Sequence, residues 1–78
     1  MDFDRDKVDE LTLALLWLVF HKDGDGTTRA WKSFDWGTMD RLHGKGYISD
    51  PKRKAGSVAV SPEGVRKAEE LFKKHFGQ

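Results

Sequence analysis

The fold is decided by the stretch RLHGKGYISDPKRKAGSVAVSPEGVRKAEELF, residues 41–72. Gly46 favours the end of a helix, because glycine readily takes the left-handed conformation that stops one. Residues 47–49 and 57–60 predict the two strands of a hairpin, since the segment DPKRKAG between them is rich in turn formers. Ser61 can cap a last helix, with Pro62 at its first position. The stretch therefore predicts a helix, a hairpin with a basic tip, and another helix.

The N-terminal half predicts the rest of a small domain. Asp4 can cap a first helix that runs on through residues 8–21, which contain the largely apolar pattern LTLALLWLVF, and Asp35 can cap the helix WGTMDRLHGK. A chain of 78 residues, 37% of them apolar, has room for one modest core. We expect a single α+β domain over residues 1–78, with three main helices and a two-stranded β-hairpin between the second and third.

The first helix is apolar on almost every face, which predicts burial on almost every face. Either the other elements wrap it, or one face that includes Trp17 packs against a second copy of the chain. Its apolar run, residues 13–20, is far shorter than the roughly 20 residues that span a bilayer. With no cysteine and an acidic N-terminus, we expect a cytoplasmic protein and no membrane partner.

Residues 41–72 resemble the second half of winged-helix domains of the bacterial multidrug-resistance regulator type. From DRDKVDE through LALL, RAWKSFDW, DRLH and ISDP to its end, the chain is also similar to a family of small bacterial single-domain proteins of unknown function. The first resemblance implies a winged-helix-like arrangement, with the basic hairpin as the wing. One departure is that residues 27–33, TTRAWKS, allow at most a turn or two of the helix that a helix-turn-helix needs there.

The bases of the wing suggest contact with nucleic-acid phosphate, although three adjacent bases are also common on a solvated turn. With Met39 and Leu42 inward, a helical plot puts Arg41 and Lys45 on the outward face with Asp40. Only the two bases among these suit base reading, so sequence readout is weakly supported. The candidate nucleic-acid-binding residues are Lys52, Arg53, Lys54, Arg41, Lys45, Arg29 and Lys32.

Three large aromatics crowd residues 31–36 with neither strand nor helix periodicity. We expect two of the rings of Trp31, Phe34 and Trp36 in the core and one partly exposed. The alternative is an aromatic patch that meets a protein partner or stacks on nucleic acid. The candidate protein-interface residues are Trp17, Trp31 and Trp36.

The remaining motifs do not indicate a metal, a cofactor or a reaction. Counted from Asp23 in DGDG, the sixth and twelfth positions of a calcium loop are Thr28 and Phe34, so a helix-ending turn fits better. His21, His43 and His75 fall on separate elements, which disfavours zinc. Asp40 and His43 are spaced for an orienting contact, and Ser57, Ser61 or Thr38 could be imagined as a nucleophile, but nothing in their spacing requires one.

Two classes of function remain open. We expect a non-enzymatic nucleic-acid-binding or regulatory domain that acts through the wing, without cofactor, metal or small-molecule substrate. The alternative is a protein-interaction module, a homodimer or an adaptor, that keeps the winged fold and has lost DNA readout.

Overall fold

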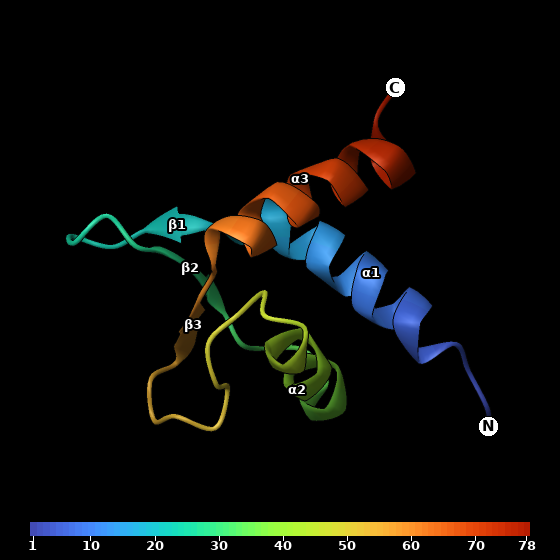
Figure 1. The fold of residues 1–78 in the computed structure, drawn as a ribbon, viewed down its shortest axis with the longest axis horizontal. Coiled ribbons are helices and arrows are strands. Elements are labelled where there is room, and N and C mark those ends of the chain that lie inside the picture. Colours follow the sequence, from blue (N-terminus) through green and yellow to red (C-terminus); the bar gives the residue numbers. More distant parts are fainter.

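The computed structural model describes residues 1–78 and has three helices with a small antiparallel sheet. The order of its elements, shown in Figure 1, is α1 (Arg5–Leu16), the 3-10 turn η1 (Trp17–Val19), β1 (His21–Lys22), β2 (Thr28–Trp31), α2 (Trp36–Gly44), β3 (Ser57–Ala59) and α3 (Pro62–Phe76). The α+β class is confirmed. The order of helices and strands is consistent with a winged-helix-like arrangement.

The predicted starts of the helices are confirmed. The side chains of Asp4, Asp35 and Ser61 each accept a hydrogen bond from a backbone N–H three residues further on. After α2, Gly46 takes a φ of 83°, in the left-handed region predicted for it. These signals are short-range, so each needs only the residues of one helical turn.

The sheet differs from the predicted two-stranded hairpin. Its order is β1-β2-β3, with Ala30 of β2 opposite Val58 of β3. Of the expected first strand, residues 47–49, only Ile48 forms a bridge, to Val60. β3 pairs mainly with β2 because that register places Ala30 and Val58 together in the core, where both are almost fully buried.

One expectation about residues 21–33 is wrong. The segment DGDG does not end the helix, because α1 stops at Leu16 and the 3-10 turn η1 stops at Val19. DGDG instead forms the tip of a hairpin between β1 and β2. There Gly26 donates its N–H to the carbonyl of Asp23 and takes a φ of 85°. Residues 28–31 form a strand and not a turn of helix, because β-branched Thr28 and the alternation of Ala30 with Trp31 suit a half-buried strand.

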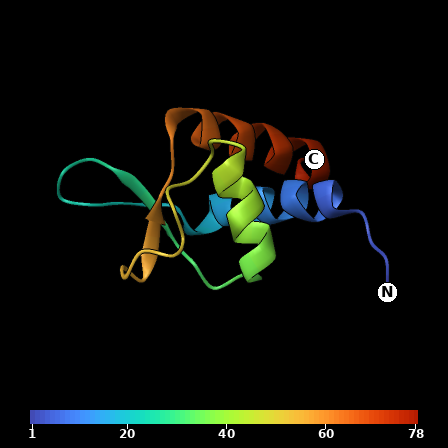
Figure 2. The same ribbon diagram turned by 60° about the horizontal axis from the view of Figure 1, so that its bottom comes forward.

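The three helices enclose the core on one side of the sheet. Figures 1 and 2 show α1 and α3 side by side, with α2 crossing α1. The buried apolar residues come from every helix and from the sheet; they are Leu13, Ala14, Leu16, Ala30, Met39, Leu42, Ile48, Val58, Val60, Ala68 and Leu71. None of the helices combines the length and the apolar character that crossing a membrane requires.

The first helix is not buried on every face. Leu15, Leu18 and Val19 are 41%, 65% and 44% exposed, on the side away from the buried Leu13 and Leu16. Trp17 is half-buried and packs against the core. The neighbouring elements therefore cover only part of α1 and η1.

Candidate nucleic-acid interface

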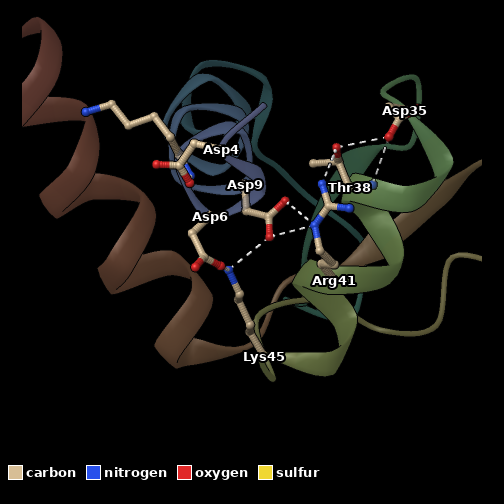
Figure 3. Close-up of polar contacts among 8 residues, drawn as sticks. Asp4, Asp6, Asp9, Asp35, Thr38, Arg41 and Lys45 are labelled. Carbon is tan, nitrogen blue, oxygen red and sulfur yellow. Dashed lines mark hydrogen bonds and ion pairs between the residues drawn. The ribbon is translucent and has the colours of Figure 1, made fainter. Parts of the chain in front are cut away.

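One buried carboxylate joins α1 to α2 (Figure 3). The side chain of Asp9 on α1 is only 1% exposed, and Arg41 on α2 donates from Nε to both of its oxygens at 2.8 and 2.9 Å. Lys45 donates from Nζ to Asp9 Oδ2 at 2.9 Å and to Asp6 Oδ1 at 3.2 Å. Because a buried charge is costly without partners, this cluster is a structural link between the two helices.

The spacing along α2 explains why these bases meet Asp9. Thr38, Arg41 and Lys45 lie three and four residues apart, which places them on one face of the helix. Arg41 Nη2 also donates to Thr38 Oγ1 at 3.2 Å, and that hydroxyl donates to Asp35 at 3.1 Å. The prediction that Arg41 and Lys45 face outward is therefore wrong: both side chains turn to α1.

The cluster raises the pKa of Lys45. The hydrogen bond to Asp9 is the main factor that raises the pKa of Lys45 above its usual 10.5. Partial burial acts in the opposite direction, while Asp6 adds to the increase. Lys45 is thus held in its charged form and is already engaged by two carboxylates.

The loop between α2 and β3 presents bases in a different setting. The side chains of Lys52, Arg53 and Lys54 are exposed and make no hydrogen bond or ion pair within the protein. The loop turns at Asp50, whose Oδ1 accepts a hydrogen bond from the backbone N–H of Lys52 at 2.9 Å. Pro51 beside it is buried and anchors the loop. We call residues 50–56 the basic loop.

Two more of the predicted phosphate contacts hold the basic loop and the sheet in place. Lys32 Nζ donates to the carbonyls of Pro51, at 2.7 Å, and of Arg53. Arg29 donates from Nε to Ser57 Oγ at 2.7 Å and from Nη2 to the Ser57 carbonyl at 2.8 Å. Of the seven predicted basic residues, the three in the loop are therefore the ones without an internal partner.

The aromatic residues 31–36 lie mostly outside the core, contrary to the expectation that two of the rings are buried. Trp31, Phe34 and Trp36 are 57%, 39% and 59% exposed. Alternation along β2 buries Ala30 and so turns Trp31 outward. Trp36 is the first residue of α2, before the positions that enter the core.

Trp31 borders the basic loop, and Trp36 lies near the lysine that binds the loop. A Cβ added at Gly56, the last residue of the loop, would lie 3.7 Å from the ring of Trp31. Lys32 Nζ, which binds loop carbonyls, lies 5.9 Å from the ring centroid of Trp36. His21 stacks on Trp31 with ring centroids 5.1 Å apart. Positive charge and exposed aromatic surface therefore occur together at this end of the molecule.

The other candidate residues have structural contacts. His43 Nδ1 lies 2.9 Å from the carbonyl of Ile48, Ser57 Oγ accepts from Arg29, and Ser61 Oγ donates to the Gly46 carbonyl at 2.7 Å. No group of three or more His, Cys, Asp or Glu side chains is placed to hold a metal ion. A small pocket of about 130 Å³ lies between the three helices, beside Lys45 and Tyr47.

Sequence reasoning missed the role of Asp9. A signal for it exists, because Asp9, Leu13 and Leu16 are spaced four and three residues apart and share one helix face. An acid in line with core leucines needs a buried basic partner. The sequence does not say which of the 14 lysines and arginines supplies it.

Comparison with known proteins agrees with the second resemblance predicted from the sequence. The chain is 49% identical over 76 residues to an uncharacterized protein, y4hR, of Sinorhizobium fredii, and the match covers 97% of each chain. No solved structure matches it. Residues 4–78 match the family model described as "Domain of unknown function (DUF6429)". The chain therefore belongs to the DUF6429 family, a small bacterial family of unknown function.

Proposed function

We propose that the protein is a small, non-enzymatic nucleic-acid-binding domain of the cytoplasm, and that the basic loop contacts phosphate. The observation that carries this proposal is the set of three adjacent bases, Lys52, Arg53 and Lys54, exposed and without an internal partner. Bases in this state can replace the counterions of a polyanion without first breaking a contact within the protein.

The other bases support the loop and do not need to touch the ligand. Lys32 fixes the loop backbone through two carbonyls, and Arg29 fixes the start of β3. A loop held in this way presents its three charges from a defined position, at a smaller entropic cost than a free tail. Contacts to phosphate place a protein on nucleic acid but read no sequence, so binding is expected to be largely nonspecific.

The test is a binding titration of a fluorescently labelled oligonucleotide, followed by anisotropy at several salt concentrations. The variant changes Lys52, Arg53 and Lys54 together to Gln, and the matched control changes Lys7, Arg66 and Lys73, three exposed bases outside the loop, to Gln. Both variants lose three positive charges, so a difference between them reports position and not net charge.

The loop variant is expected to bind roughly 10-fold to 100-fold more weakly at low salt, and its salt slope should fall by about 2. The control should remain close to wild type. Equal binding by wild type and loop variant would overturn the proposal, as would equal losses in both variants.

A second candidate function is association with a protein partner, the partner being a second copy of the chain. It is favoured by the exposed Leu15 and Leu18, which continue the half-buried Val8 and Leu11 at spacings of three, four and three residues. That spacing is the seam of paired helices. Sedimentation at about 50 µM is the test: dimer in wild type and monomer after Leu15→Gln with Leu18→Gln would support it, and a wild-type monomer would refute it.

A further inference from the structure

The helix that a duplex reader would place in the major groove is poorly equipped for that task. Base reading in the groove needs free side chains such as Arg, Asn, Gln or Lys on the inserted helix. Arg41 on α2 and Lys45 at its C-terminal end are both held by Asp9. The acids Asp35 and Asp40 remain exposed on or next to that helix, where they would repel phosphate. These bases on and next to α2 are therefore not free to contact the base edges of a double-stranded ligand.

The sheet offers a different kind of surface. Buried Ala30 and Val58 point from the sheet into the core, so Arg29 and Trp31 on β2 point to the opposite face. His21 on β1 lies opposite Arg29 in the strand register, and its ring stacks on Trp31 at an interplanar angle of 28°. The outer face therefore carries an indole that is held in place by a neighbour and still more than half exposed.

The basic loop begins where this face ends. Trp31 pairs in register with Ser57, directly after the loop, and its ring lies beside Gly56. The backbone N–H of Lys32 donates to the Gly56 carbonyl at 3.3 Å, which ties the strand end to the loop. A ligand whose phosphate lies on the loop therefore has an exposed aromatic ring next to it.

We infer that the ligand of the basic loop is single-stranded nucleic acid, and that Trp31 is the platform on which an unpaired base stacks. This inference rests on the proposed function and adds the class of nucleic acid to it. The bases of a duplex are already stacked on one another, whereas those of a single strand leave a face free for an aromatic side chain. Trp36, whose ring centroid lies 5.9 Å from Lys32 Nζ, is a second exposed ring.

The experiment compares three labelled ligands of one mixed sequence, about 12 nucleotides long: a DNA strand, the same strand as RNA, and the DNA duplex. The proteins are wild type, Trp31→Ala, Trp31→Phe and the loop variant with Lys52, Arg53 and Lys54 changed to Gln. Phe3→Ala is the control, because Phe3 is also an exposed aromatic, 47% exposed, but lies outside the sheet and the loop. Circular dichroism establishes that each variant is folded.

Wild type should bind the single strands more tightly than the duplex. Trp31→Ala should weaken single-strand binding between about 5-fold and 100-fold and leave the salt slope unchanged, because stacking involves no counterion. Trp31→Phe should keep most of the affinity, and Phe3→Ala all of it. A preference for RNA or for DNA is compatible with the inference, since both present unpaired bases.

The possible failures are distinct. The single-strand inference is overturned if the duplex binds as tightly as the single strands or more tightly, or if Trp31→Ala does not weaken single-strand binding. In either case, weaker binding by the loop variant still supports the proposed function. Wild-type affinity of the loop variant for every ligand overturns the proposed function itself.

Discussion

Two groups of bases lie close together in the sequence and have opposite surroundings. Arg41 on α2 and Lys45, directly after that helix, are bound by Asp9 on α1, whose side chain is 1% exposed. Lys52, Arg53 and Lys54 follow a few residues later and have no partner. The difference shows that the availability of a base for a ligand depends on which acid the fold brings to it, even when the local sequences look alike.

The largest effect is expected when the acid of the cluster is removed. Asp9→Asn should lower the free energy of unfolding by about 3 kcal/mol, because Arg41 and Lys45 lose the buried charge that they surround. The loss lies at the low end of the range for buried pairs, since their side chains are 28% and 37% exposed. Urea unfolding measures it.

The control for that variant is Asp6→Asn, which removes a carboxylate that is 91% exposed from the same cluster. It should cost less than about 1 kcal/mol. Similar losses in the two variants would contradict the distinction between the buried and the exposed acid.

The next largest effect on stability compares one base from each group, Arg41 and Arg53, by the same substitution. Arg41→Gln should cost about 2 kcal/mol, since it removes two hydrogen bonds to a charged and buried group. Arg53→Gln, the same change in the basic loop, should alter stability by no more than about 0.5 kcal/mol. If the unfolding curves of the two variants coincided, the Asp9 cluster would not be what stabilises the packing of α2 on α1.

A smaller effect concerns pH. The folded-state pKa of Lys45 is raised above 10.5, the value expected for the unfolded chain. Its contribution to stability is therefore fully present below pH 10.5 and is lost as the pH rises through the higher folded-state pKa. Because Lys45 is 37% exposed, solvent screening keeps the contribution below about 1 kcal/mol.

The measurement is the urea midpoint of wild type and of Lys45→Gln over a series of alkaline pH values. The other lysines titrate in both proteins, so the difference between the two curves isolates Lys45. That difference should be constant below pH 10.5 and should narrow above it. A constant difference throughout would mean that the pKa of Lys45 is not raised.

The smallest expected effect on stability distinguishes Lys32, which holds the backbone of the basic loop, from the exposed bases of the loop itself. Lys32→Met removes donors to the carbonyls of Pro51 and Arg53 and should cost about 0.5 kcal/mol in global stability. Amide hydrogen exchange in the basic loop should become faster, because the loop opens more often. Lys54→Met should leave both quantities unchanged, and faster exchange in that control would refute the assignment.

Local signals in the sequence were sufficient for the helices but not for the sheet. The caps Asp4, Asp35 and Ser61 act on an N–H three residues away, and all three were predicted correctly. The pairing of β2 with β3 joins residues 28 positions or so apart, as in Ala30 and Val58, and depends on which register fills the core. No short pattern in the sequence contains that information.

The same limit applies to the candidate site. The three bases of the loop were recognisable because they are adjacent and free of acids in the sequence. The sequence did not show that Arg41 binds Asp9, which lies 32 positions away, or that Trp31 points outward. Both features follow from the tertiary arrangement, since each depends on which residues of another helix or strand pack against the side chain.

The short strands also affect how the protein behaves in a concentrated solution. A long, flat sheet edge is a template on which other chains can add strands and form fibres. Here one edge, β1, is two residues long and includes the charged Lys22. Beside the other edge, β3, Ile48 is paired with Val60, and Ser49 donates its N–H to the carbonyl of Ala59. The fold can therefore leave the outer face of its sheet open to a ligand while giving an aggregating strand little backbone to pair with.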